Sequence, residues 1–394
     1  MTIEISRRGL LRVGAAAAVT GFVPTRFAIG GTAKVKVGMM LPYSGTYAGL
    51  GEAISNAFKM SLAEGGGKFG GREVELIALD DESNPGKAPE NANKLVAGDK
   101  VDFVVGTVHS GVAMGMIKVT RESGTITVIP NAGANAATGP MCAPNIFRTS
   151  FSSWQACYPM GKVAVERGLK KVVTITWKYA GGDEMVGAFV ENFTKSGGTV
   201  VEQIQVPFPS EEFQAYLTQI AALKPDGVFA FFAGSGALKF VKDYAAAGLK
   251  GIQLMGPGFL TDGVLAGQGP AAEGVLTTLH YADALDTPEN KKFRAAYKAA
   301  YGKDADVYAV QGYDAAQLLA HGMTAVNGDT GAREALIGAM EKAVIKSPRG
   351  TFTFSKAHNP IQDIYLRQVK NGQEIVLGVA DPALSDPARG CKMA

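Results

Sequence analysis

Histidine, cysteine and tryptophan are scarce in this sequence, and their scarcity limits the kinds of functional site that it can form. The 394 residues include four histidines, three cysteines and two tryptophans. The histidines lack the spacing of zinc ligands, so no metal site is expected. No Gly-x-Gly-x-x-Gly follows a predicted strand and no Gly-x-Ser-x-Gly is present, so neither a nucleotide cofactor nor a nucleophile elbow is indicated. We expect neither an enzyme nor a bound cofactor.

Long apolar runs are also missing, apart from one near the N-terminus. Val13–Val23 is an apolar run of 11 residues, too short to span a bilayer and typical of a signal peptide. It follows Ser6–Arg12 (SRRGLLR), a twin-arginine pattern. Cleavage is expected after Ala33 or, alternatively, after Gly30. The sequence therefore predicts a signal peptide over residues 1–33 and twin-arginine export to the periplasm.

An excess of positive charge is missing from the mature chain. The full sequence has 39 basic and 36 acidic side chains, and the predicted signal peptide holds four arginines and one glutamate. The remaining chain therefore carries 35 of each sign and has no formal net charge. Because nucleic acids and anionic lipids attract basic surfaces, neither is expected as a partner.

The three cysteines allow at most one disulfide within the chain. Export favours disulfide formation. Cys142 lies in a predicted loop, Cys391 lies near the C-terminus and Cys157 lies in a predicted helix. We expect Cys142 to pair with Cys391 and Cys157 to be a small apolar core residue. The other pairings stay open at this point.

Strands and helices alternate along the chain. Alternation of this kind predicts parallel sheets with helices on both faces and ligands beyond the carboxyl ends of the strands. The fold class is therefore α/β, with two doubly wound parallel-sheet lobes joined by a multi-strand hinge. The first four predicted strands are Val35–Leu41, Glu73–Leu79, Val101–Val105 and Thr125–Ile129. We expect a first lobe from 34–150 plus 281–350, a second lobe from 151–280 plus 351–380, and a tail from 381–394.

An anion site is expected where the strand Val101–Val105 leads into a helix that begins near Ser110. A helix N-terminus offers unpaired N–H groups and a partial positive charge to an anion. The Ser110 hydroxyl can cap the helix or contact a ligand. Tyr47 and Phe259 lie in other predicted exit loops and are further candidate ligand contacts.

Several short segments, in their order and spacing, resemble one family over residues 34–380. The chain resembles the solute-binding proteins of ABC importers, in the branched-chain amino acid (leucine-binding) group with the type I periplasmic binding fold. The segments that carry the resemblance are Val35–Gly38, Leu41–Gly45, Asp80-Asp81, Asn84-Pro85, Val105-Gly106, His109-Ser110, Pro130–Ala132, Phe147–Thr149, Ala246–Leu249, Met255–Pro257 and Tyr313–Ala315.

The resemblance implies a set of ligand contacts. Amino-acid binders of this group hold the ligand carboxylate by hydroxyls and backbone N–H groups of the first lobe. Ser110 matches the serine at the helix start, and Gly133 falls where a second hydroxyl residue is usual. The remaining matched positions are Asn131 and Ala132 in the pocket loop, Tyr179 and Ser235 in the second lobe, and the aromatic residue Tyr308.

Gly258 departs from the amino-acid binders of the group, which usually have an acidic residue there to hold the ligand ammonium. A buried ammonium without a charge partner is costly. We therefore expect a small aromatic or aliphatic carboxylate as ligand, delivered by a monomeric protein to an inner-membrane permease. The alternatives are a branched-chain amino acid binder, a ligand-sensing module for a membrane receptor, and an exported enzyme.

Overall fold

The first lobe contains a six-stranded sheet in the order β2-β3-β1-β4-β5-β6. The computed structural model describes residues 33–394, so the expected twin-arginine pattern and apolar run lie outside the described residues. The strands β3, β1, β4, β5 and β6 are parallel, and the short β2 is antiparallel to β3. Their bounds are β1 Val35–Leu41, β2 Lys68–Phe69, β3 Arg72–Asp80, β4 Phe103–Gly106, β5 Ile126–Ile129 and β6 Ile146–Arg148.

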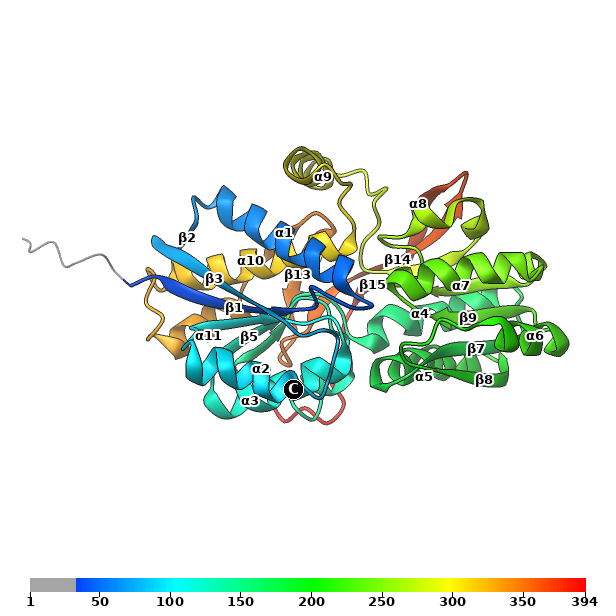
Figure 1. Ribbon diagram of the computed structural model, residues 1–394, viewed down its shortest axis with the longest axis horizontal. Coiled ribbons are helices and arrows are strands. Elements are labelled where there is room, and N and C mark those ends of the chain that lie inside the picture. Colours follow the sequence, from blue (N-terminus) through cyan, green and yellow to red (C-terminus); the bar gives the residue numbers. More distant parts are fainter. Residues whose placement is uncertain (1–32) are drawn as a thin grey trace, which may run out of the picture. The chain divides into compact units, whose positions relative to one another are not determined.

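Helices cover both faces of this sheet. α1 (Ala48–Glu64) and α10 (Val307–Ala325) lie on one face, and α2 (Ala88–Asn93) and α3 (Ser110–Ser123) lie on the other (Figure 1). α9 (Pro288–Tyr301) and α11 (Arg333–Glu341) complete the lobe. A turn precedes α2, in which Asn84 Oδ1 accepts from the Gly86 N–H at 2.9 Å. A single π-helical turn, Lys94–Gly98, follows α2.

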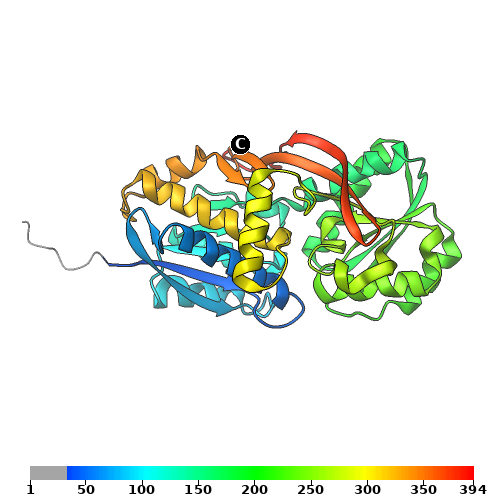
Figure 2. The ribbon, with the colours of Figure 1, turned by 90° about the horizontal axis from the view of Figure 1, so that it is seen from above.

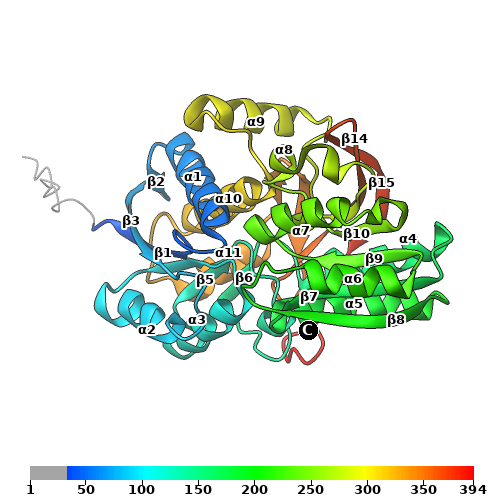
Figure 3. The ribbon, with the colours of Figure 1, turned by 45° about the vertical axis from the view of Figure 1, so that its right-hand side comes forward.

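The second lobe, largely green in Figure 2, repeats the plan of the first. Its parallel strands lie in the order β8-β7-β9-β10-β11. α7 and α5 lie on opposite faces of this sheet (Figure 3). The bounds are β7 Lys171–Lys178, β8 Thr199–Pro207, β9 Gly227–Phe231, β10 Gln253–Pro257, β11 Leu276–Leu279, α4 Ser153–Glu166, α5 Ala180–Lys195, α6 Gln214–Leu223, α7 Gly234–Ala246 and α8 Leu265–Gln268.

Four antiparallel strands extend this second sheet at the junction of the lobes. β14 (Pro360–Lys370) pairs with β11, with β13 (Gly350–Phe354) and with β15 (Gln373–Leu384), and β12 (Ile345–Ser347) pairs with β13. The β14–β15 hairpin is the red ribbon of Figure 2. Two expected boundaries therefore differ. Residues 345–350 belong to the second sheet, and residues 381–384 are part of β15 rather than of the tail.

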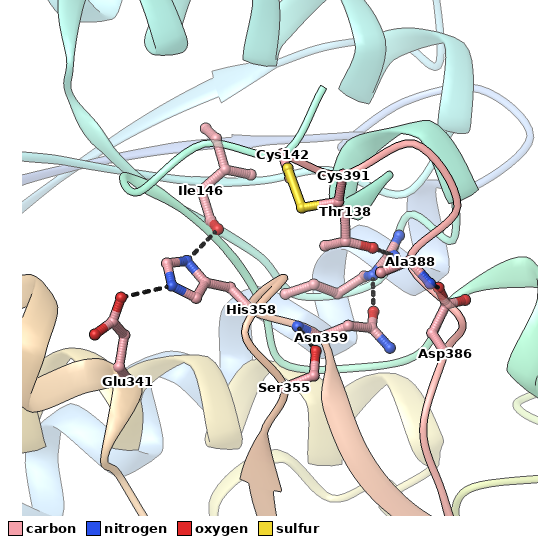
Figure 4. Close-up of a disulfide and its surroundings, with 11 residues drawn as sticks. Thr138, Cys142, Ile146, Glu341, Ser355, His358, Asn359, Asp386, Ala388 and Cys391 are labelled. Carbon is pink, nitrogen blue, oxygen red and sulfur yellow. Dashed lines mark hydrogen bonds and ion pairs between the residues drawn. A yellow bond between two sulfur atoms is a disulfide. The ribbon is translucent and has the colours of Figure 1, made fainter. Parts of the chain in front are cut away.

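The disulfide between Cys142 and Cys391 is present, as expected, with a Cα–Cα distance of 5.5 Å (Figure 4). Cys157 is buried in α4 and unpaired. The disulfide holds the C-terminal segment against the first lobe. In the same segment, Arg389 donates to both carboxylate oxygens of Glu191, at 3.0 and 2.7 Å, on α5 of the second lobe. The segment thus contacts both lobes.

The described helices were compared with the length and apolarity that a bilayer-spanning helix needs. The longest described helix, α10, has 19 residues. Among residues 33–394, no helix has both the length and the apolarity needed to cross a bilayer. α10 packs against α1, and thirteen of its residues are buried, including the polar Gln311 and Asp314.

Candidate functional site

A cavity lies between the lobes, beside the carboxyl ends of parallel strands from both sheets. Side chains of both lobes line it, and most of them are aromatic or aliphatic. This location agrees with the rule for ligands of parallel α/β sheets. The lining residues are Tyr47, Leu50, Val108, Ser110, Asn131, Gly133, Phe151, Tyr179, Met185, Phe231, Ala233, Phe259 and Tyr308.

Seven of the nine residues expected from the sequence line this cavity: Tyr47, Ser110, Asn131, Gly133, Tyr179, Phe259 and Tyr308. Ser235 does not, contrary to expectation. It is exposed on the first turn of α7, and its hydroxyl donates to Glu211 Oε1 at 2.5 Å. Ala132 is buried behind the wall, where its N–H donates to the Thr107 carbonyl at 3.0 Å.

Ser110 is the first residue of α3, but it does not cap the helix. The cap is His109, whose Nδ1 accepts from the Gly111 N–H at 3.0 Å. A Cβ built on Gly181 of the second lobe would lie 2.8 Å from Ser110 Oγ. Ser110 is thus left available to a ligand, beside a helix N-terminus and close to the opposite lobe.

Tyr47 and Tyr179 meet across the cavity. Their hydroxyl oxygens are 3.3 Å apart, and either can be the donor. Burial raises the pKa of both phenols, so both keep their protons at neutral pH. Since one hydroxyl accepts from the other, one of the two protons remains free to reach a different acceptor.

Tyr308, at the start of α10, has a buried hydroxyl with no hydrogen-bond partner within the described residues. Its ring lies 6.0 Å from that of Phe259, measured between centroids. A buried hydroxyl without a partner costs free energy. Because Tyr308 lines the cavity, a ligand oxygen is a suitable acceptor.

Gly133 lacks the hydroxyl that the family often has, and the structure gives a steric reason. A Cβ at Gly133 would lie 2.7 Å from Phe151 Cε2 and 2.8 Å from Ser153 Oγ. The ring of Phe151 therefore occupies the space that a side chain at 133 needs. Phe151 also packs on Phe259, with ring centroids 4.7 Å apart.

The structure changes the reasoning about Gly258. A Cβ at this position would collide with the Arg367 guanidinium and approach Asp262. These two side chains form a buried ion pair at 2.8 Å and do not line the cavity. Phe259 is the residue of this turn that lines the site. An apolar ring thus takes part of the wall, and an acidic residue at 258 would not fit without rearrangement.

No Asp, Glu, Lys or Arg of residues 33–394 lines the cavity. In the same part of the chain, no three His, Cys, Asp or Glu side chains are grouped as metal ligands. The polar lining consists of the hydroxyls of Tyr47, Ser110, Tyr179 and Tyr308 and of Asn131, whose Nδ2 donates to Gln311 Oε1 at 2.7 Å. The site offers neutral donors between aromatic walls.

Sequence reasoning missed six lining residues: Leu50, Val108, Phe151, Met185, Phe231 and Ala233. Phe231 is the last residue of β9, immediately before an exit loop, and this position at a strand end is a usable signal. Phe151 follows β6 in a segment that passes between the lobes, and Met185 faces the site from within α5. Only the packing of the two lobes brings these last two residues to the cavity.

The family-level comparison is decisive, because residues 34–374 match the family model described as periplasmic binding protein. The chain belongs to the periplasmic binding protein family. A curated relative, Leu/Ile/Val-binding protein homolog 6 of Brucella melitensis, is 34% identical over 348 residues, which cover 86% of this chain and 88% of that protein.

Solved structures of solute-binding proteins agree with this family assignment. One from an ABC transporter of R. palustris, in complex with benzoate, is 54% identical with a TM-score of 0.90, covering 91% of this chain and all of that one. Another, from Rhodopseudomonas palustris BisB5 with 3,4-dihydroxybenzoic acid, is 32% identical with a TM-score of 0.85, covering 90% and 99%. The sequence-based assignment to ABC solute-binding proteins of the leucine-binding group, with the type I fold, is confirmed.

Proposed function

We propose that this periplasmic binding protein captures a small aromatic carboxylate by closing its lobes and delivers it to an ABC permease in the inner membrane. The observation that carries the proposal is the lining of the cavity. Aromatic and aliphatic side chains surround hydroxyl and amide donors, and no described acidic side chain is present to hold an ammonium. A single-ring acid suits a site of this polarity.

The arrangement of donors gives the ligand an orientation. The carboxylate would lie between Ser110, at the N-terminus of α3, and the Asn131–Gly133 loop, where donors are available. The ring would lie against Tyr179, Phe151 and Phe259, which are all buried or half-buried aromatic residues. Closure removes water from these contacts and so strengthens them.

Two similar proteins support this ligand class. The R. palustris protein, 54% identical to this chain, was solved with benzoate, and the BisB5 protein, 32% identical, with 3,4-dihydroxybenzoic acid. Both ligands are benzene rings that carry one carboxyl group. We extend that ligand class, without a particular ring substitution, to this protein.

A branched-chain amino acid is the second candidate, because the Brucella melitensis relative is named as a Leu/Ile/Val-binding homologue. Such a ligand brings a positive ammonium into the closed site. Desolvating that group without a carboxylate partner costs several kcal/mol. The uncharged lining therefore favours the aromatic acid.

We also propose export by the twin-arginine route, from the Ser6–Arg12 pattern. Replacing Arg7 and Arg8 together by lysine is expected to retain the protein in the cytoplasm, as measured by cell fractionation and immunoblotting. Replacing Arg26, which lies outside the pattern, is the matched control and should leave export unchanged. Periplasmic accumulation of the doubly substituted protein would contradict this route.

The ligand proposal is tested by isothermal titration calorimetry on protein unfolded in denaturant, dialysed and refolded, which removes any ligand retained from the cells. Benzoate, 3,4-dihydroxybenzoate, leucine and valine are titrated separately. We expect at least one benzoate to bind roughly 100-fold more tightly than either amino acid, equivalent to about 2.7 kcal/mol. Tighter binding of leucine or valine than of every aromatic acid would overturn the proposal.

A further inference from the structure

Arg148, the last residue of β6, is completely buried and close to the ligand cavity without lining it. Two other buried arginines form ion pairs, Arg349 with Asp314 at 3.2 Å and Arg367 with Asp262 at 2.8 Å. Arg148 makes no such pair within the described residues. All of its hydrogen bonds go instead to uncharged acceptors, and the carboxylates of Asp386 and Glu184 favour its charge only from beyond ion-pair distance. Burying a cation in this way is costly.

The Arg148 guanidinium holds the loop that lines the cavity. Its Nη1 donates to the Ala134 carbonyl at 2.8 Å and to the Ala132 carbonyl at 3.3 Å, one on each side of Gly133. The Ala132–Gly133 peptide is trans, so its N–H points opposite to its C=O. Because the Ala132 carbonyl is directed toward Arg148, which does not line the cavity, the Gly133 N–H is directed away from Arg148.

The Gly133 N–H makes no hydrogen bond with residues 33–394, although Gly133 lines the cavity. The Gly133 carbonyl is fixed separately by the N–H and the hydroxyl of Ser153, at 2.7 and 2.9 Å. Both peptide groups of Gly133 are therefore held in orientation. A donor of fixed direction loses little entropy when an anion binds to it.

The other side of Arg148 is anchored to the region of the hinge. Its Nε donates to Asn359 Oδ1 at 2.7 Å, and its Nη2 donates to the hydroxyl of Thr138. Figure 4 shows Thr138 and Asn359 near the disulfide. Asn359 in turn donates to Gln155 Oε1 at 2.6 Å, on α4 of the second lobe. Each nitrogen of the guanidinium is thus fixed by its neighbours.

We propose that Arg148 is a positioning residue for the ligand carboxylate: it holds the Ala132 and Ala134 carbonyls so that the Gly133 N–H donates into the cavity. Its charge also polarises the Ala132–Gly133 peptide, which makes that N–H a stronger donor. This inference rests on the proposed function, since it assumes a carboxylate in the cavity. A lysine keeps the charge but cannot hold both carbonyls and both anchors.

Arg148→Lys is compared with Arg349→Lys, its matched control. Arg349 is also buried and donates to the Ser150 carbonyl at 3.0 Å, but it does not contact the 131–134 loop. Benzoate and its neutral analogue benzamide are titrated by calorimetry, and unfolding is followed without ligand. Arg148→Lys should raise the Kd for benzoate roughly 10- to 100-fold and affect benzamide less. Arg349→Lys should change the Kd for benzoate less than about threefold at a similar loss of stability.

A spectroscopic measurement keeps the inference testable if Arg148→Lys does not fold. Labelling with ¹³C-carbonyl alanine and ¹⁵N-glycine selects the seven Ala–Gly pairs of the chain, and the signal that Ala132→Ser removes from this set identifies the Gly133 amide. This signal should shift downfield when benzoate is added to the unmodified protein. Thr138→Val, which removes one anchor of Arg148, should weaken benzoate binding about threefold or more. If the Gly133 amide signal does not move, or if the two lysine variants raise the Kd for benzoate equally, the role of Arg148 is overturned. The proposed function is not affected by either result. Failure of the unmodified protein to bind any aromatic acid would overturn the proposed function and this inference with it.

Discussion

The imidazole of His109 stacks on the phenol ring of Tyr179, with ring centroids 4.6 Å apart and planes inclined by 27°. His109 caps α3 in the first lobe, and Tyr179 precedes α5 in the second. One side chain therefore both completes the helix N-terminus at the candidate anion site and contacts the opposite lobe. Burial lowers the pKa of His109 to about 4, so the ring is neutral at physiological pH and its Nδ1 can accept from Gly111.

The first prediction concerns acid stability. His109 has a pKa near 6.5 when unfolded and about 4 when folded. Between these values the unfolded chain binds the proton more strongly, so stability falls as the pH is lowered from 6.5 to 4, by about 3 kcal/mol in total. In urea unfolding, the stability difference between the unmodified protein and His109→Asn, which retains a capping side chain, should shrink over this range. The exposed His321→Asn is the control, and a constant difference for His109→Asn would contradict the assignment.

The second prediction tests Ser110. Ser110→Ala removes a hydroxyl from the cavity without removing the cap of α3, which His109 supplies. The Kd for the aromatic acid should rise roughly tenfold, with little change in the unfolding midpoint. Ser235→Ala is the matched control, because Ser235 also begins a helix but is exposed and bonded to Glu211. If calorimetry gives equal affinities for the two variants, Ser110 does not contact the ligand.

The third prediction concerns the Tyr308 hydroxyl, which has no partner in the described part of the chain. Tyr308→Phe should leave the ligand-free protein as stable as before, or more stable by about 1 kcal/mol, because a buried unpaired group is removed. Ligand affinity should fall about tenfold. The combination of unchanged stability and lost affinity, measured by thermal unfolding and calorimetry, distinguishes a ligand contact from a packing role. A variant with unchanged affinity would show that the ligand does not reach this hydroxyl.

The fourth prediction tests the steric relation between Gly133 and Phe151. A Cβ at Gly133 lies 2.7 Å from Phe151 Cε2, so Gly133→Ala should destabilise the protein by about 1–3 kcal/mol through overpacking. Phe151→Leu shortens the opposing side chain. In a double-mutant cycle followed by urea unfolding, the cost of Gly133→Ala should be at least about 0.5 kcal/mol smaller when Phe151→Leu is already present. If the losses of stability of the two variants are additive, the strain of Gly133→Ala does not come from contact with Phe151.

Much of the architecture can be predicted because it depends on local signals. Apolar runs such as Val101–Val105 and helical spacing in Ala48–Glu64 identify the elements, and their alternation implies parallel sheets. Exit loops follow directly from that topology, which is why Tyr47, Asn131 and Phe259 can be assigned to the cavity. These predictions need no knowledge of how the lobes pack.

The errors arise where side-chain direction or tertiary packing decides. Ser235 lies in the first turn of a helix, as Ser110 does, yet it is exposed. The sequence does not show which side of a helix start faces a cleft. The family resemblance indicates a missing charge partner at Gly258, whereas in the structure a side chain at that position would meet Arg367. Phe151 reaches the cavity only through the path of a segment between the lobes. Such positions depend on contacts between residues far apart in the chain.

The disulfide between Cys142 and Cys391 encloses a sequence separation of 249 residues. This covalent ring contains the whole second lobe, all the strands at the junction, and the helices α9, α10 and α11 of the first lobe. A protease that cuts one peptide bond inside the ring leaves a nicked molecule whose pieces remain covalently joined. A cut between residues 34 and 141 has no such protection, because the strands β1 to β5 precede the ring.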